Sequence, residues 1–207
     1  IFNLLPFDDR YMLIYMVDVS GHGMSSALIA TLVSQALLPH SGVLVGNENK
    51  QDVLPPGQVL AELDKMFPFG RFEKFFTMFL AYYDEKKQAL TYSHAAHPFG
   101  YILHRDGKIS HLEQGGSVIG IQAGVPFQEI SVPWCTGDKL VLFTDGITEM
   151  SNPSGEMFGW ERLFDFFADN QHLPCSQLKN ALEQELGRFA GNAPPQADIS
   201  FSCVEVK

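Results

Sequence analysis

The chain has 207 residues, of which 45% are hydrophobic and 12% aromatic. This is enough to build one substantial hydrophobic core, so the composition is that of a globular protein and not of a disordered one. The formal net charge of −10 and the pI near 5.0 argue against a nucleic-acid or anionic-membrane partner, because like charges repel. A protein partner or a phosphorylated substrate is easier to accommodate.

The first third of the chain has the pattern of a strand, a turn and two helices. Tyr11 to Val17 is an apolar run that predicts a buried strand, and Met24 to Leu38 has the apolar spacing of a helix. Ser41 to Pro56 is rich in Gly, Asn and Pro, which predicts a mobile surface loop. Gly57 to Phe67 then resumes helical spacing.

From Phe75 to Leu142 the composition predicts short strands in an antiparallel meander. Turn signals separate these strands at Asp84–Lys87, Asp106-Gly107, Gly115-Gly116 and Gly137-Asp138. Asp106-Gly107 is the clearest hairpin signal, since this pair suits a type I′ turn.

The final third returns to helix and closes with one strand. Trp160 to Asp169 and Ser176 to Phe189 are predicted helices, and Asp198 to Val206 is the predicted strand. Helices before and after a run of strands indicate an α+β fold, in which helices cover antiparallel sheet. With no internal repeat or linker, residues 1–207 are expected to form one domain.

The three cysteines, Cys135, Cys175 and Cys203, lack a Cys-x-x-Cys pair, which predicts ordinary thiols in a reducing compartment and a cytoplasmic protein. Polar residues interrupt the longest apolar stretch, Ala27 to Leu38, so no membrane span is expected. The sequence starts with Ile1 directly ahead of a strand pattern, and we therefore expect a longer parent protein.

Two strand ends carry an aspartate beside glycine. Asp18 ends an apolar run and the turn Gly21-His22-Gly23 follows, while Asp145 ends a second apolar run and Gly146 follows. Carboxylate oxygens are the ligands that Mg²⁺ and Mn²⁺ prefer, and a glycine turn before a helix suits phosphate. Together the two ends predict one shared site, although a tight turn or a cap accounts for either one alone.

The sequence gives less support to a nucleotide-binding site, a serine nucleophile or a histidine metal site. Ser26 stands where a dinucleotide fingerprint needs its third glycine, no Walker loop is present, and Ser20 lacks the context of a hydrolase nucleophile. His94 and His97 lie three residues apart on a predicted strand and therefore point to opposite faces. Hydrogen-bonding roles are predicted for both histidines rather than ligation of one ion.

Five segments, in this order, resemble the bacterial PP2C-like (PPM) serine phosphatases of the SpoIIE and RsbU type: Asp18–Gly23, Ser93–Pro98, Thr144–Glu149, Phe158-Gly159 and Asp198–Ser200. The resemblance runs through nearly the whole chain. It implies an α-β-β-α sandwich, two antiparallel sheets flanked by helices, with a dinuclear Mn²⁺ or Mg²⁺ centre.

The resemblance also implies roles for particular residues. Asp18 matches the carboxylate that bridges both ions, the carbonyl of Val19 completes the first ion's shell, and Asp145 binds the second ion. The implied reaction is hydrolysis of phosphoserine or phosphothreonine by a metal-activated water, without a phosphoenzyme. Substrate-side roles are expected for Gly21, His22 and Gly146.

The chain departs from the family pattern in its last motif. The family places a metal-binding Asp where this chain has Ala197, directly before Asp198. The resemblance then leaves three alternatives. Asp198 shifts to take the ligand position, water fills that position and the metal affinity falls, or the domain has lost catalysis. Neighbouring residues on a strand face opposite sides, so compensation by Asp198 needs a bulge or a different turn. A further family Asp falls upstream of Ile1.

Members of this group often follow the receiver domain of a response regulator, as in RssB-like proteins, and dimerise through an upstream helix. The resemblance therefore implies two alternative functions. One is an active phosphatase acting on a phosphorylated anti-sigma-factor antagonist in two-component and sigma-factor signalling, which Asp18 and Asp145 favour. The other is a pseudophosphatase adaptor that binds a protein such as a sigma factor, which Ala197 motivates.

Overall fold

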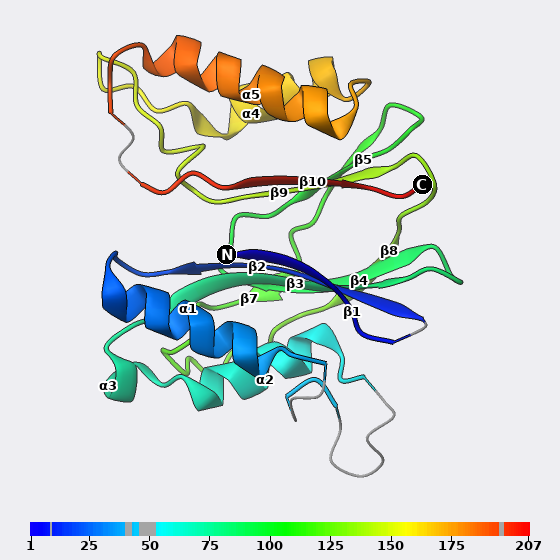
Figure 1. The fold of residues 1–207 in the computed structure, drawn as a ribbon, viewed down its shortest axis with the longest axis vertical. Coiled ribbons are helices and arrows are strands. Elements are labelled where there is room, and N and C mark those ends of the chain that lie inside the picture. The colour runs from blue at the N-terminus through cyan, green and yellow to red at the C-terminus, as the bar shows by residue number, and fades with distance from the viewer. Residues whose placement is uncertain (9, 40–42, 46–52, 195–196) are drawn as a thin grey trace. The chain divides into compact units, whose positions relative to one another are not determined.

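The computed structural model describes residues 1–8, 10–39, 43–45, 53–194 and 197–207, shown in colour in Figure 1. The chain forms two compact units, one of Ile1–His97 with Glu113–Pro133 and the other of Pro98–Leu112 with Trp134–Lys207. Much of the predicted loop Ser41 to Pro56 lies outside the described residues, and the single domain over residues 1–207 stays a prediction.

The first unit is a six-stranded sheet with helices on one face (Figure 1). Its strands run in the order β1-β2-β3-β4-β7, and β8 also pairs with β4. Their bounds are β1 Phe2–Pro6, β2 Tyr11–Val19, β3 Phe76–Asp84, β4 Ala89–Ala95, β7 Gly115–Gly116 and β8 Ile130–Pro133. The helices are α1 Met24–Ala36, α2 Pro56–Met66 and the short α3 Phe69–Phe72. All strand pairs are antiparallel except β4 with β7.

Alternate residues of β2 build the core of this unit. Leu13, Tyr15 and Val17 are at most 2% exposed and share one apolar cluster with residues of α1 and α2, among them Val33 and Leu60. Successive side chains of a strand point to opposite faces, so these three lie on the face that the helices cover. The predicted buried strand is confirmed, and it extends two residues further, through Asp18 to Val19.

The second unit is a four-stranded sheet in the order β10-β9-β5-β6, with two helices on one face (Figure 1). Its elements are β5 Tyr101–Leu103, β6 Ile109–His111, β9 Lys139–Phe143, α4 Gly159–Asn170, α5 Cys175–Ala190 and β10 Phe201–Glu205. Leu163 and Phe167 of α4 and Leu182 of α5 are buried in one cluster with Val141 and Phe143 of β9. Both predicted helices are confirmed, within a few residues of their expected ends.

The predicted single meander from Phe75 to Leu142 is wrong. Strands β3 and β4 form a hairpin, but β5, β6 and β9 belong to the other sheet. Gly115 and Gly116 form β7 rather than a turn, and a Cβ on Gly115 would lie 2.2 Å from the carbonyl oxygen of His94. Strand composition predicts that a segment is extended, but it does not identify its partner.

The hairpin at Asp106-Gly107 exists, but its predicted type I′ turn is wrong. Only Gly107 has a positive φ, 91°, and Asp106 does not. The Gly107 N–H donates to the carbonyl of His104, and the His104 N–H donates to the carbonyl of Lys108. This pattern encloses three loop residues, which need positive φ at the glycine alone.

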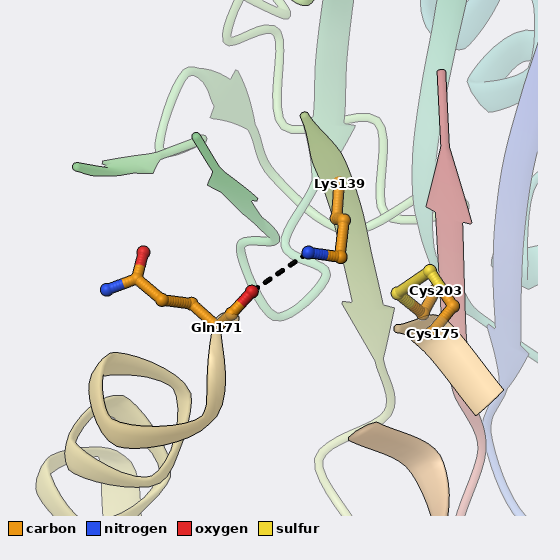
Figure 2. Close-up of a disulfide and its surroundings, with 4 residues drawn as sticks. All are labelled: Lys139, Gln171, Cys175 and Cys203. Carbon is orange, nitrogen blue, oxygen red and sulfur yellow. Dashed lines mark hydrogen bonds between the residues drawn. A yellow bond between two sulfur atoms is a disulfide. The ribbon is translucent and has the colours of Figure 1, made fainter. Parts of the chain in front are cut away.

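One disulfide and one hydrogen bond connect the helices of the second unit to its sheet, as Figure 2 shows. Cys175, the first residue of α5, forms a disulfide with Cys203 of β10, with a Cα–Cα distance of 5.4 Å. Lys139 Nζ of β9 donates a 2.8 Å hydrogen bond to the carbonyl of Gln171 at the end of α4. The prediction of three ordinary thiols is therefore wrong for two of them, and Cys135 remains free.

Asp138 organises the turn that enters β9. This buried carboxylate accepts hydrogen bonds from the N–H groups of Arg105 (2.9 Å) and Cys135 (3.0 Å), and lies 3.1 Å from Nδ1 of His104. Burial alone would raise the pKa of Asp138, but the hydrogen bonds from these three residues outweigh it and lower the pKa. The charged form is therefore the stabilising form.

Asp138→Asn is expected to reduce the free energy of unfolding at pH 7 by about 1–3 kcal/mol, because an amide cannot satisfy all three donors. The wild-type contribution is fully present above the unfolded-state pKa of about 3.9 and is lost as pH falls through the lower folded-state pKa. Urea unfolding at pH 7 and pH 3 should show the two proteins converging in acid. Exposed Asp169, changed to Asn, is the control; equal stability of the Asp138 variant at pH 7 contradicts this role.

Within the described residues, no helix is both long enough and apolar enough to cross a membrane.

Candidate active site

Strand β2 places Asp18 at its end, in a fixed register with β3. Asp18 pairs with Thr77 and Val19 pairs with Phe76. Asp18 and Val19 are half-buried, whereas Leu13 to Val17 before them are buried. Residues paired across antiparallel strands point to the same face, so the side chain of Thr77 lies next to that of Asp18.

Thr77 connects this strand end to a buried histidine. Its Oγ1 lies 2.8 Å from Nδ1 of His97, which is 3% exposed. His94 uses Nε2 for a 3.1 Å hydrogen bond with the carbonyl of Glu113. The predicted hydrogen-bonding roles of both histidines are confirmed. The sequence did not reveal that His97 bonds the neighbour of Asp18, because that follows from the strand register.

The residue after Val19 is held by four hydrogen bonds. The Ser20 N–H donates to the Phe75 carbonyl (2.9 Å), and Ser20 Oγ accepts from the Phe75 N–H (3.2 Å). The Ser20 carbonyl accepts from Ser26 Oγ (3.1 Å) and from Lys74 Nζ (3.0 Å). The backbone that leaves the Asp18 strand is thus fixed to the start of β3 and to helix α1.

The glycine turn that follows needs glycine for its backbone conformation and leads into a helix without a side-chain cap. Gly21 and Gly23 have φ of 74° and 88°, and a Cβ on Gly21 would lie 2.9 Å from Lys74 Nζ. His22 between them is exposed. Helix α1 begins at Met24 without a side-chain cap, so its first N–H groups favour an anion. The turn suits a phosphate group.

In the second unit, Asp145 follows β9 and lies beside the last motif of the chain. Thr144 donates its N–H to the Ser200 carbonyl (3.1 Å) and its Oγ1 to the Asp198 carbonyl (2.9 Å). A Cβ on Gly146 would lie 2.6 Å from the carbonyl oxygen of Asp198, so this close approach requires glycine. The structure therefore brings the segment of Asp145 and Gly146 next to the segment of Asp198.

The turn after Asp145 leaves its carboxylate available. Its carbonyl accepts hydrogen bonds from the Glu149 N–H (2.9 Å) and Thr148 Oγ1 (3.0 Å). Among the described residues, no cation or hydrogen-bond donor contacts the half-buried Asp145 side chain. Such a carboxylate can bind a metal ion or water without first breaking an internal contact.

The predicted strand from Asp198 to Val206 is shorter in the structure, which changes the argument about Asp198. Strand β10 begins at Phe201, so Ala197 and Asp198 precede it. The rule that neighbours face opposite sides does not apply outside the strand. Asp198 is exposed, and within the part of the chain that the structure describes its carboxylate has no partner.

The donors at these strand ends fit hard divalent ions in type. They are oxygen atoms: the Asp18 carboxylate and Val19 carbonyl in the first unit, and the carboxylates of Asp145 and Asp198 in the second. Mg²⁺ and Mn²⁺ select such ligands. Over the described ranges, no three His, Cys, Asp or Glu side chains gather into one metal-binding group. The dinuclear centre therefore stays a prediction.

Comparison with known proteins finds a matching family model and several similar proteins. The family model described as Stage II sporulation protein E (SpoIIE) matches residues 8–207. The phosphoserine phosphatase RsbU of Bacillus subtilis is 31% identical over 152 residues, which are 72% of this chain and 42% of RsbU. The phosphoserine phosphatase RsbP of the same organism is 27% identical over 212 residues, 100% of this chain and 49% of RsbP. The chain spans less than half the length of either relative.

Solved structures show the same fold. The SiaA-PP2C domain of Pseudomonas aeruginosa has a TM-score of 0.80 at 22% identity, covering 100% of this chain and 80% of that one. The PP2C phosphatase domain of SpoIIE from Bacillus subtilis, with a fragment of its regulatory domain, has a TM-score of 0.75 at 15% identity. That match covers 99% of this chain and 57% of the other. The predicted α+β class, with two sheets and helices of the PP2C-like type, is confirmed.

Proposed function

The chain belongs to the SpoIIE family of PP2C-like phosphatase domains, and from this membership we propose that it is a metal-dependent protein serine/threonine phosphatase. The observation that supports the proposal is that Asp18 lies in the last two residues of β2 and Asp145 lies two residues after β9, the positions to which the resemblance assigns metal ligands. Both have half-buried side chains beside a glycine turn. Two relatives, RsbU and RsbP, are named phosphoserine phosphatases.

Asp18, the Val19 carbonyl and Asp145 would hold Mn²⁺ or Mg²⁺. Such ions, when bound, make a water molecule nucleophilic near neutral pH and stabilise charge on the phosphoryl group. The chain itself supplies positioning: Ser20 fixes the backbone beyond Asp18, and the turn around Gly21 leaves room for phosphate at the uncapped start of α1. His22 is exposed at this turn, which supports a substrate-side role.

The proposed substrate is a phosphorylated regulatory protein of the anti-sigma-factor antagonist type, in two-component and sigma-factor signalling. RsbU and RsbP support a regulatory setting by their resemblance to this chain. An upstream receiver domain, a homodimer formed through an upstream helix and a cytoplasmic location belong to the same proposal. Neither a nucleic acid nor a membrane is expected as a partner, because the net charge is −10.

A second candidate function is a pseudophosphatase that keeps the fold as a protein-binding adaptor, for example for a sigma factor. One observation favours it: Ala197 stands where the family has a metal-binding Asp, and its side chain has no ligand atom. The Asp198 carboxylate lies next to it before β10 begins, and its exposure leaves it open to substitute for that ligand.

Ala197→Asp is expected to lower the Mn²⁺ concentration for half-maximal activity about 10-fold, because it adds a charged oxygen ligand. The measurement is Mn²⁺-dependent phosphate release from a phosphoserine peptide by the full-length protein. Ala197→Asn is the matched control, since it adds similar volume without the charge. The absence of turnover at millimolar Mn²⁺ in both wild type and Ala197→Asp overturns the phosphatase proposal and favours the adaptor.

A further inference from the structure

The second unit carries a cavity outside the residues assigned to phosphate hydrolysis. Its volume is about 350 Å³, within the range of small-molecule and side-chain binding pockets. It lies against α4 and the strands β5 and β6, and its lining includes Phe99, His111, Trp160, Glu161, Phe164 and Asp165. Two kinds of side chain make up this lining, aromatic rings and carboxylates.

The rings form a continuous aromatic wall. Phe99 stacks on Trp160 with ring centroids 4.4 Å apart and an interplanar angle of 15°. Phe99 also stacks on His111 at 5.7 Å, and His111 lies 5.4 Å from Phe164. Trp160 is 38% exposed, so the wall presents indole surface to solvent. A planar cation can stack on such a surface.

The carboxylates beside this wall are not neutralised. Glu161, Asp165 and Asp169 follow each other four residues apart on α4, and all are exposed. Across the described residues, none of the three has an ion-pair or hydrogen-bond partner. Glu161 and Asp165 lie one helical turn apart, and like charges at this spacing repel. A cation bound in the cavity relieves this repulsion.

The basic residue on the same helix is engaged elsewhere. Arg162 pairs with Glu156 and donates to the carbonyls of Met157 and Phe158 at 3.0 Å, and its guanidinium lies over the Phe189 ring. The cavity lining contains no Lys or Arg. The negative charge at the cavity is therefore not balanced by a side chain that lines it.

We propose that this cavity binds the guanidinium of an arginine presented by a protein partner. A guanidinium is planar, stacks on aromatic rings and forms paired hydrogen bonds with carboxylates, and the cavity offers both kinds of group side by side. An ammonium is a more strongly hydrated point charge and uses the stacking surface less well. The net charge of −10 adds long-range attraction for a basic partner. The proposal does not depend on phosphatase activity.

The chain contains its own probe for this binding. Of its two tryptophans, Trp134 is 2% exposed and Trp160 is 38% exposed, so ligand-dependent fluorescence changes report on the cavity. N-acetylarginine amide is expected to give a saturable change in this fluorescence. N-acetylcitrulline amide has the same shape without the charge and is expected to bind at least about 10-fold more weakly.

The double variant Glu161→Gln/Asp165→Asn is expected to weaken binding of N-acetylarginine amide at least about 10-fold. Both side chains are exposed, so its urea midpoint should stay close to that of the wild type, which shows that the fold is kept. Asp169→Asn, one turn further on and outside the lining, should bind as the wild type does. Equal binding of arginine and citrulline amides, or unchanged binding by the double variant, overturns the proposal.

Discussion

Asp18→Asn and Asp145→Asn are each expected to reduce metal-dependent phosphate release at least about 100-fold in kcat/KM, equivalent to about 2.7 kcal/mol of transition-state stabilisation. The substitution keeps the shape of the side chain but removes the charge that a divalent ion requires. Both side chains are half-buried at strand ends, so the variants should fold normally. Steady-state kinetics at saturating Mn²⁺, with urea unfolding as the fold check, measures both effects.

The double variant Asp18→Asn/Asp145→Asn tests whether the two residues serve one reaction. If they do, the double variant should be about as slow as the slower single variant, because groups that act as a unit have non-additive effects. Glu149→Gln is the local control, an exposed carboxylate four residues after Asp145. Full activity of either single variant contradicts the phosphatase proposal, and strictly multiplicative losses contradict a shared role.

The position of Asp18 could be predicted from the sequence, but its surroundings could not. An apolar run followed by Asp and a glycine turn marks a strand end, and β2 ends there. The neighbours Thr77 and His97 come from other strands or their ends, and only the register between β2 and β3 brings Thr77 beside Asp18. Register depends on the packing of the whole sheet, which local patterns do not contain.

The segment around Asp198 is a second place where local sequence patterns did not predict the structure. Its residues suggested a strand from Asp198, and the alternation rule then argued against Asp198 as a replacement ligand. The strand begins at Phe201, because the Asp198 carbonyl accepts a hydrogen bond from Thr144 instead of joining a ladder. A side chain from a distant segment overrode the local pattern. The backbone at Asp198 is therefore held by Thr144 rather than by a strand ladder.

The cysteine prediction failed because disulfide geometry is a tertiary property. Cys175 and Cys203 are 28 residues apart, and nothing in that spacing shows that the start of α5 lies on β10. The helix packs there because Leu178, Leu182 and Leu186 are buried in the core of the second unit. The apolar stripe of α5 thus places its first residue over the strand.

Cys175→Ser and Cys203→Ser are each expected to reduce the free energy of unfolding by about 3.5 kcal/mol, the loop-closure entropy for a bond that spans 28 residues. For a chain of 207 residues this lowers Tm by roughly 7–14 °C. The double variant should match either single variant, because each change breaks the same bond. The apolar contacts of α5 remain, so all three variants should stay folded at 25 °C.

Thermal unfolding with and without dithiothreitol separates the bond from the cysteine side chains. The wild type should lose the same stability on reduction, whereas the Cys175→Ser variant should not respond. Cys135→Ser is the control, because this free and partly exposed thiol takes no part in the bond. Identical melting of the oxidised and reduced wild type contradicts a stabilising disulfide. Because a reducing cytoplasm opposes such bonds, the same comparison measures how much stability this chain would give up there.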